Sequence, residues 1–395
     1  MRLKQLISLV KLCYKIVFVI IGFLPVKKRL IIFESYLGKQ YSCNPKAIYE
    51  YLKANHPEYE LLWSVDKKYS QPFMEKQIPY VKRFSLKWLW LLPRAEYWIT
   101  NCRMPLWQKK PRHTTYIQTW HGTPLKKLGF DIEEVHMPGT TTVKYRQDFY
   151  AESRQWDLLI SPNQYSTEIF RRAFRFEKEI LETGYPRNDI LIQKNQRESI
   201  NRLKEKMGIP KDKKVILYAP TWRDNDYVEI GKYKFTLHLE LEQMKRALGD
   251  EYVILLRLHY LISRNLDVSA YKGFVFESTN QDIQELYLVS DVLITDYSSV
   301  FFDYMCLKRP IIFFTYDLEI YRDKLRGFYF DFEQKAPGPL VKTTKEVIHE
   351  IKQLSGKEFT PTPEYMMFYE QFCSLEQGVS TARVVKGAIL EREKK

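Results

Sequence analysis

The ten residues SDVLITDYSS, at positions 290–299, place a short apolar run directly before a turn and two serines. Val292–Thr295 has the length and composition of a buried strand, and Ser298 or Ser299 stands where a helix through Phe301 would begin. A strand that opens into a helix is the repeating unit of a parallel sheet covered by helices. The stretch therefore predicts an α/β fold.

The same pattern recurs along the chain. The other expected strands are Leu30–Glu34, Leu61–Val65, Tyr97–Thr100, Thr115–Gln118, Leu158–Ser161, Ile180–Thr183, Val215–Ala219, Tyr252–Leu258, Phe274–Glu277 and Ile311–Phe314. The expected helices are Pro45–Ala54, Thr142–Ser153, Ser166–Phe174, Leu239–Leu248, Gln281–Leu288, Ser299–Leu307 and Thr344–Leu354. This alternation predicts two Rossmann-like domains that face each other across a cleft. The charged stretch 193–214 divides the halves, so we expect a segment 1–28, a domain 29–205 and a domain 206–395 whose C-terminal helix crosses back.

Length, charge and cysteine content narrow the class of protein. A chain of 395 residues is too long for one ordinary core. Its formal net charge of +14 indicates a polyanionic partner: nucleic acid, an anionic membrane surface or a phosphate-rich substrate. No zinc-finger spacing or RNA-binding motif favours nucleic acid, and a merely soluble basic surface remains an alternative for much of the charge. Five scattered cysteines indicate a reducing compartment.

The N-terminus is apolar over residues 3–24, but Lys4, Lys11 and Lys15 interrupt it at helical spacing. The uninterrupted run 16–24 is shorter than the roughly 20 residues that span a bilayer. We expect an amphipathic helix that lies on the inner leaflet with its basic residues toward lipid phosphates. The alternatives are a helix packed on the protein's own core and, less favoured, a signal peptide.

Polar and charged side chains follow several of the expected strands. They are His121, Gly184–Asp189, Pro220–Arg223, Arg257–His259 and Asp296–Ser299. Ligands of open α/β sheets bind beyond the carboxyl ends of the strands, so these residues are expected to line one cleft. Histidine suits proton transfer near neutral pH, and a guanidinium matches two phosphate oxygens. The pattern predicts a site for a phosphorylated substrate.

Each of these residues also has a purely structural interpretation. A single histidine is usually structural, a lone arginine usually forms a surface salt bridge, and the serines could cap a helix and bind nothing. Two histidines that end strands in opposite halves favour function. The sequence contains no nucleophile elbow, Walker loop, HExxH helix or aspartate pair for a divalent metal. We therefore expect direct displacement, without metal or cofactor, in which positioned side chains stabilise charge.

Four ordered segments carry a family resemblance. They are WHGTPLK (120–126), GYPRND (184–189), YAPTWR (218–223) and SDVLITDYSS (290–299), with RPIIFF (309–314) and RGFY (326–329) following. Over residues 30–385 the chain resembles the CDP-glycerol glycerophosphotransferases of wall teichoic acid synthesis. The resemblance implies a GT-B-like fold, an N-terminal acceptor-side domain and a C-terminal domain that binds the CDP-alditol. It also implies a peripheral protein on the cytoplasmic side of the cell membrane.

The resemblance further implies which residues act. Glycerol phosphate would pass from CDP-glycerol to a hydroxyl of an undecaprenyl-diphosphate-linked acceptor, with CMP leaving. His121 would be the base, and His259 would assist catalysis. The donor contacts it implies are His121, Gly122, Thr123, Pro124, Leu125, Arg187, Pro220, Thr221, Arg257, Leu258, His259, Ser298, Ser299 and Asp303.

Three other functions stay open at this stage. A CDP-ribitol enzyme of the same family would share these motifs, and a GT-B glycosyltransferase would use a nucleotide sugar instead. An inert membrane adaptor would have no need of the histidines, arginines and serines together. Family polymerases often carry a further N-terminal region, whose absence from this sequence favours a primase or a short extension. Homo-oligomer formation is left open.

Overall fold

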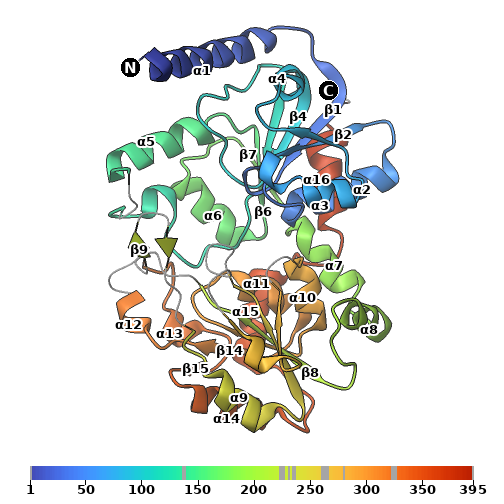
Figure 1. Cartoon of the computed structure of the whole chain (residues 1–395), viewed down its shortest axis with the longest axis vertical. Coiled ribbons are helices and arrows are strands. Elements are labelled where there is room, and N and C mark those ends of the chain that lie inside the picture. The colour runs from blue at the N-terminus through green and yellow to red at the C-terminus, as the bar shows by residue number, and fades with distance from the viewer. Residues whose placement is uncertain are drawn as a thin grey trace. The chain divides into compact units, whose positions relative to one another are not determined.

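The computed structural model describes residues 2–135, 139–221, 227–229, 232–233, 237–258, 267–278, 281–321 and 327–393. The chain forms two compact units, each built on a parallel sheet (Figure 1). The N-terminal unit consists of Met1–His121, Gly129–Asp189 and Leu375–Lys395, and the C-terminal unit consists of Gly122–Leu128 and Ile190–Ser374. Leu375–Lys395 thus belongs to the unit to which the C-terminal helix was expected to return.

The boundary expected near residue 205 lies instead at the bond between Asp189 and Ile190. The charged stretch that was expected to divide the halves contains helix α8 (Arg197–Lys206), which packs against α10 (Ile283–Val289) of the C-terminal unit. The exposed face of a surface helix has the same charge-rich composition as a linker, so composition alone misplaced the boundary.

The N-terminal unit contains a seven-stranded sheet in the order β3-β2-β1-β4-β5-β6-β7, and every neighbouring pair is parallel. Its strands are β1 (Lys27–Glu34), β2 (Glu60–Val65), β3 (Tyr80–Lys82), β4 (Ala95–Thr100), β5 (Thr115–Gln118), β6 (Leu158–Ser161) and β7 (Glu179–Glu182). Glu34 of β1 is in register with Thr100 of β4, and Thr100 with Gln118 of β5. The residues that follow these three strands therefore share one edge of the sheet.

Helices of the N-terminal unit cover this sheet, and the end of the chain completes its core. They are α1 (Arg2–Ile21), α2 (Cys43–Asn55), α3 (Gln71–Glu75), α4 (Leu86–Leu91), α5 (Thr142–Ser153), α6 (Gln164–Ala173) and α16 (Ser380–Val385), while α7 (Asp189–Gln193) spans the boundary. In Figure 1, α16, drawn red, lies beside α2, drawn blue. Val384, Val385 and Ile389 are buried with Phe33 and Trp63 of the sheet. This late segment is thus part of the first hydrophobic core.

The C-terminal unit contains a six-stranded parallel sheet in the order β12-β11-β8-β13-β14-β15. Its strands are β8 (Lys214–Ala219), β11 (Tyr252–Leu256), β12 (Val275–Glu277), β13 (Val292–Thr295), β14 (Ile311–Phe314) and β15 (Leu340–Val341), and β9 (Tyr227–Glu229) pairs with β10 (Lys232–Tyr233). Its helices besides α8 and α10 are α9 (Leu241–Leu248), α11 (Val300–Tyr304), α12 (Leu318–Ile320), α13 (Phe332–Lys335), α14 (Thr344–Leu354) and α15 (Pro363–Cys373).

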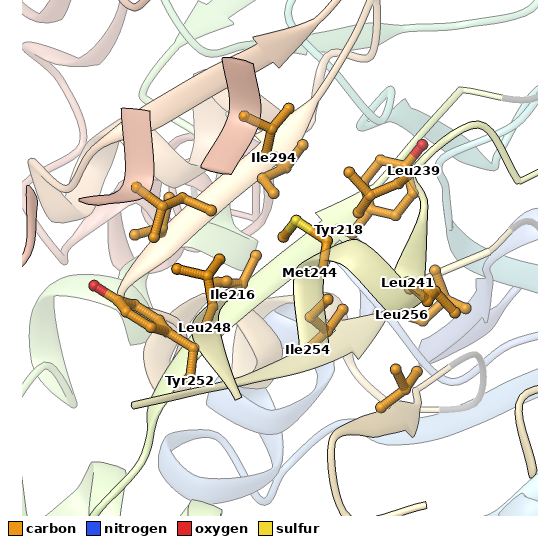
Figure 2. Packing of buried hydrophobic residues seen from close by; sticks show 14 of the residues in the cluster. Ile216, Tyr218, Leu239, Leu241, Met244, Leu248, Tyr252, Ile254, Leu256 and Ile294 are labelled. Atoms are coloured by element: carbon orange, nitrogen blue, oxygen red, sulfur yellow. The ribbon is translucent and has the colours of Figure 1, made fainter. Parts of the chain in front are cut away.

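The core of the C-terminal unit forms between its sheet and two amphipathic helices. Figure 2 shows Met244 and Leu248 of α9 beside Ile216 of β8 and Ile254 of β11. Val347 of α14 belongs to the same buried cluster. Apolar residues at helical spacing face apolar residues at strand spacing, and burying a side chain of this size stabilises the fold by about 1.5–3 kcal/mol.

Helix α1 is amphipathic, but it also packs on the protein. Phe18 is fully buried, with its ring 5.7 Å from Trp88 and 5.5 Å from Trp107 between centroids. The Tyr14 hydroxyl donates a hydrogen bond to the Ser85 carbonyl at 3.4 Å. The alternative of a helix packed on the protein's own core is therefore correct for one face of α1. Among the described residues, no helix combines the length and hydropathy that crossing a bilayer requires.

Candidate active site

His121 follows β5 in the N-terminal unit, at the edge where β1, β4 and β5 end. Its imidazole is stacked on Trp120, with ring centroids 4.8 Å apart, and meets the ring of Tyr36 edge-on at 5.8 Å. Its Nδ1 lies 2.7 Å from the carbonyl oxygen of Asn101. The ring is therefore held on two sides and at one nitrogen.

This hydrogen bond assigns the tautomer of His121. A carbonyl oxygen accepts hydrogen bonds and cannot donate one, so Nδ1 carries the proton and Nε2 has a lone pair in the neutral ring. Burial lowers the pKa of His121 to about 4; the charge of Arg187 acts in the same direction, and the bond to Asn101 opposes both. The imidazole is thus neutral near pH 7 and can accept a proton at Nε2.

Two further side chains fix the main chain around His121. The Nδ2 of Asn44 donates to the carbonyls of Thr119 and Trp120, both at 3.2 Å. Arg187, which is 8% exposed, donates from Nη1 to the His121 carbonyl at 2.8 Å and to Cys43 Sγ at 3.2 Å. Arg187 is therefore buried beside His121, and the surface salt bridge that was the alternative interpretation is wrong.

Backbone strain gathers at the same place. Tyr36, Leu37, Cys43 and Trp120 have φ angles of 47°, 59°, 66° and 52°, in the left-handed region that side chains of this size rarely adopt. Such residues cost on the order of 1–3 kcal/mol each and persist where the surroundings hold them, most often at functional sites. Four of them beside one histidine and one buried arginine indicate a site built for more than stability.

In the C-terminal unit, the loop Gly122–Leu128 packs against the segment that follows residue 326. The Leu125 carbonyl accepts a hydrogen bond from the Tyr329 N–H at 2.9 Å, and the Lys127 N–H donates to the Gly327 carbonyl at 3.3 Å. The Lys126 ammonium donates to the Tyr321 hydroxyl at 2.8 Å. These bonds explain why a segment from the first third of the chain belongs to the second unit.

Gly122 lies so close to Ser299 that a larger residue there would force the Ser299 hydroxyl to move. A Cβ at Gly122 would stand 2.8 Å from the Ser299 hydroxyl oxygen. Contacts below 3.0 Å essentially never occur at real Cβ atoms. Thr123, Pro124 and Leu125 are buried next to this contact in the chain. The loop and the first residues after β13 are therefore fitted to each other.

The expected donor residues of the C-terminal unit follow three neighbouring strands. Thr221, which comes after Pro220 at the end of β8, donates its N–H to Asp296 Oδ1 at 2.8 Å, which joins the ends of β8 and β13. Arg257 follows β11 and donates from Nη1 to the Ser278 carbonyl at 2.6 Å. Strand β11 ends at Leu256, so Arg257 and the buried Leu258 lie beyond the strand that was expected to include them. Adjacent strand ends place these residues along one edge of the second sheet.

The serine-capped helix is shorter than expected. Helix α11 (Val300–Tyr304) has five residues and continues as a 3₁₀ turn, Met305–Leu307. Ser298 Oγ accepts the Val300 N–H at 3.4 Å, while Ser299 occupies the N-cap position without a side-chain capping bond. Asp303 is 4% exposed and is the acidic residue of the first turn of α11. So short a helix has a small dipole.

Several expected residues are outside the described part of the chain. His259, Trp222, Arg223 and Arg326 cannot be placed, so the expected role of His259 stays a prediction. Convergence of the two sets of residues on one cleft also stays a prediction. Within the described residues, His121 and Arg187 belong to the N-terminal unit, and the other expected contacts belong to the C-terminal unit.

Comparisons with known proteins agree with the motifs. The family model of the CDP-Glycerol:Poly(glycerophosphate) glycerophosphotransferases matches residues 16–390. The chain belongs to this family. A teichoic acid poly(glycerol phosphate) polymerase of Bacillus spizizenii is 57% identical over 96% of both chains. Another, from Bacillus subtilis, is 58% identical over 96% of this chain and 51% of its own length, so the chain spans about half of that relative.

The glycerophosphotransferase fold is confirmed by a solved structure. A variant of the wall teichoic acid polymerase TagF, obtained with CDPG, superimposes with a TM-score of 0.88 at 41% identity, covering 99% of this chain and 96% of that chain. The expected GT-B-like pair of Rossmann-like domains is therefore correct. The Bacillus spizizenii polymerase is matched over nearly its whole length. Chain length thus gives no ground for preferring a primase over a polymerase.

Sequence reasoning did not select Asn44 and Asn101, two residues whose hydrogen bonds hold His121 and the main chain before it. Asn101 directly follows an expected strand, so the rule that selected His121 could have selected it as well. Asn44 carries no such signal, because it lies in the first turn of α2 and acts on residues about 75 positions away. Both are fully buried, a rare state for asparagine unless its amide is hydrogen-bonded.

Proposed function

We propose that this protein transfers glycerol phosphate from CDP-glycerol to a hydroxyl of a lipid-linked teichoic acid precursor, with release of CMP. The observation that carries the proposal is His121, a neutral imidazole held at Nδ1 by a backbone carbonyl within the first motif of the family. Such a ring presents Nε2 as a proton acceptor. The relatives that share more than half of the aligned residues are named for glycerol phosphate, which supports that donor over CDP-ribitol.

The chemistry is a single displacement at phosphorus. Nε2 of His121 removes the proton of the acceptor hydroxyl, and the oxygen attacks the phosphorus that carries glycerol. The bond between this phosphorus and the bridging oxygen breaks, and CMP leaves with the electron pair. General-base assistance of this kind contributes roughly 10²–10⁴-fold to the rate.

The donor is held by residues that follow the strands of the C-terminal unit. Gly122 and Ser299 provide a closely fitted turn, and the cationic Arg257 follows the neighbouring strand β11. Positioned donors that face developing negative charge lower the barrier without reorganisation during the reaction. The reaction uses neither metal nor cofactor in this proposal.

The acceptor is reached at the membrane surface, on the cytoplasmic side. Helix α1 and the residues after it leave large apolar side chains exposed: Leu9, Val10, Leu12, Ile16, Val17, Val19, Ile20, Phe23 and Leu24. Helix α4, which contacts α1, adds Leu86 and Trp90, which are 82% and 47% exposed. Lys11 and Lys15 are exposed on the same helix α1. An apolar surface with basic residues favours an anionic lipid interface.

The deciding experiment measures CMP release from CDP-glycerol and, separately, from CDP-ribitol. Purified protein is supplied with a synthetic lipid-linked saccharide acceptor. Release with CDP-glycerol alone supports the proposal, and release with CDP-ribitol alone transfers it to the ribitol enzyme. If neither donor releases CMP and the protein instead transfers sugar from a nucleotide sugar, it is a GT-B glycosyltransferase.

Sedimentation with anionic vesicles tests the membrane part separately. Deleting residues 1–24 or changing Leu86 and Trp90 to glutamate should each release the protein from the vesicles. A double change of Ile320 and Met367 to glutamate, at exposed positions of α12 and α15 in the other unit, is the matched control for the loss of two exposed apolar side chains and the gain of two negative charges. Equal sedimentation of all variants contradicts a membrane surface formed by α1 and α4.

A further inference from the structure

Asn101 connects the ends of three adjacent strands of the first sheet. It directly follows β4, and its side chain lies toward the end of β1: Oδ1 accepts the Tyr36 N–H at 2.9 Å, and Nδ2 donates to Ser35 Oγ at 3.0 Å. Its own carbonyl accepts the Nδ1–H of His121, which follows β5. Asn101 is fully buried and uses its side-chain amide and its carbonyl in these bonds.

Tyr36 depends on this anchor because its backbone is strained. Its φ angle of 47° and that of Leu37, 59°, are both left-handed. Strained residues keep such angles where several bonds hold them. The bonds that hold this turn include the one from the Tyr36 N–H to Asn101, the one from Arg83 Nη1 to the Leu37 carbonyl at 2.7 Å, and the one from the Gly38 N–H to the Ser35 carbonyl at 3.0 Å. Among these, the bond to Asn101 is the one made directly to Tyr36 by a side chain.

The ring of Tyr36 in turn limits the orientation of His121. The imidazole lies between the face of Trp120 and the edge of Tyr36, with an interplanar angle of 26° to the first ring and 61° to the second. If the strained turn relaxes, the Tyr36 ring moves from the imidazole. The imidazole can then rotate, and Nδ1 loses the acceptor that assigns its proton.

We propose that Asn101 is a positioning residue of the transfer reaction, whose side chain keeps Tyr36 against His121 and whose carbonyl selects the Nδ1–H tautomer. The inference rests on the proposed function, because it assigns His121 Nε2 as the base. Asn101 itself touches no reacting atom. Partners that orient a metal-binding histidine through its second nitrogen typically contribute about 10–100-fold to activity, and we expect the same magnitude for a histidine base.

The main chain at Asn101 has other supports, so a variant without the side chain can fold. The Thr100 carbonyl accepts the Thr119 N–H at 2.7 Å, and the Cys102 carbonyl accepts a hydrogen bond from Gln118 Nε2 at 3.2 Å. Replacing Asn101 therefore removes the anchor of Tyr36 and leaves the path of the strand ends in place.

The test measures the tautomer of His121 and the turnover of the full chain in separate experiments. Protein labelled with ¹⁵N in its histidine rings is compared as wild type, Asn101→Ala and Asn101→Asp, and the His121→Gln spectrum identifies the signal among the seven histidines. Wild type should show one neutral tautomer, protonated at Nδ1. Asn101→Ala should show a mixture, and kcat for CMP release should fall about 10–100-fold while KM for CDP-glycerol changes less than about threefold.

Asn101→Asp keeps the acceptor for the Tyr36 N–H and should restore the single tautomer. Its carboxylate also adds negative charge near His121, so the acidic limb of the pH–rate profile should move to higher pH. The other ionisable groups that face this cluster are Arg187 on the turn Pro186–Asn188, Tyr36 after β1, Cys43 on α2 and Cys102 after β4. They are unchanged in the variant, so the shift reports the new charge.

Asn163→Ala is the matched control for loss of a buried asparagine in the same unit. Asn163 is 2% exposed, and its Oδ1 caps α6 through the Ser166 N–H at 2.9 Å. Asn163→Ala should lower the melting temperature, because α6 loses its cap, and leave the His121 tautomer unchanged. If Asn101→Ala does not fold, the proposal is tested by the shift of the acidic limb of the pH–rate profile in Asn101→Asp.

A single Nδ1–H tautomer in Asn101→Ala, or wild-type kcat with a mixed tautomer, overturns the inference. An unshifted pH limb in Asn101→Asp overturns it as well. Wild-type protein that shows the tautomer but releases no CMP refutes the proposed function instead. The nitrogen spectrum still reads the tautomer in that case, so the two failures are distinguishable.

Discussion

Acidification gives a sharp test of His121 as the base. Burial, with the charge of Arg187, lowers the pKa of its imidazole to about 4. At pH 5 the base would then be about 90% unprotonated, against about 3% for a histidine with the ordinary pKa of about 6.5. The active fraction differs about 30-fold between these two cases, which is well beyond the error of a rate measurement.

The assay is the pH dependence of kcat/KM for CDP-glycerol, which reports the ionisation of the free enzyme. CMP release should be nearly flat from pH 7 to pH 5 and should fall tenfold per pH unit below about 4. Arg187→Gln should move this limb to higher pH, because a repelling charge is removed. His121→Ala should lose roughly 10²–10⁴-fold in kcat and have no such limb. A wild-type limb near the ordinary histidine pKa, or the same limb in His121→Ala, refutes the reasoning.

The same shift predicts how stability depends on pH. The unfolded chain binds the His121 proton at an ordinary pKa of about 6.5, and the folded protein binds it at about 4. Between these values the unfolded state holds more protons, so the free energy of unfolding decreases as the pH falls, by at most about 3 kcal/mol from this group. The difference in urea midpoint between wild type and His121→Ala should therefore narrow on acidification. A difference that stays constant contradicts the lowered pKa.

Three further predictions concern single features. Gly122→Ala should turn the Ser299 hydroxyl away from its position and raise KM for CDP-glycerol roughly fivefold, which corresponds to about 1 kcal/mol, the low end of the cost of overpacking. Gly387→Ala, whose Cβ would meet its nearest atom at 3.5 Å, should leave KM unchanged. Equal effects of the two changes contradict a contact between Gly122 and Ser299. Burial raises the pKa of Glu34 even though Arg83 lies 3.2 Å away and lowers it. Arg83→Met should therefore cost about 1–3 kcal/mol, the range for leaving a buried polar group without its partner; an unchanged melting temperature argues against this. Excess EDTA should leave CMP release unchanged, and loss that Mg²⁺ restores would show a metal requirement.

Much of the fold was predictable because its strands are buried on both sides. Runs such as Leu30–Phe33 and Val292–Thr295 are almost wholly apolar and stand out from the helices between them. Strands β3 and β15, with three and two residues, are too short for such a pattern and were missed. Helix α8 lies in the charged stretch that was expected to divide the halves, and its charged residues gave no sign that it packs on the C-terminal unit.

The candidate site was predictable in part. The rule that ligands bind beyond strand ends selected His121 and Thr221, which the structure places at the ends of β5 and β8. It gave no reason to select Asn44, whose role appears only when α2 folds against the residues after β5. The lowered pKa of His121 could not be predicted either, because it depends on burial, which no local sequence pattern indicates.

The late segment that completes the first core governs the order in which the protein can fold. During synthesis, residues 1–189 emerge without Leu375–Lys395, so the site on their surface that later receives Val384, Val385 and Ile389 is uncovered. The ribosome must produce the whole second unit before the first is finished. A nascent chain therefore carries an unfinished apolar surface through about half of translation, and a fragment cut at the boundary should depend on chaperones or aggregate.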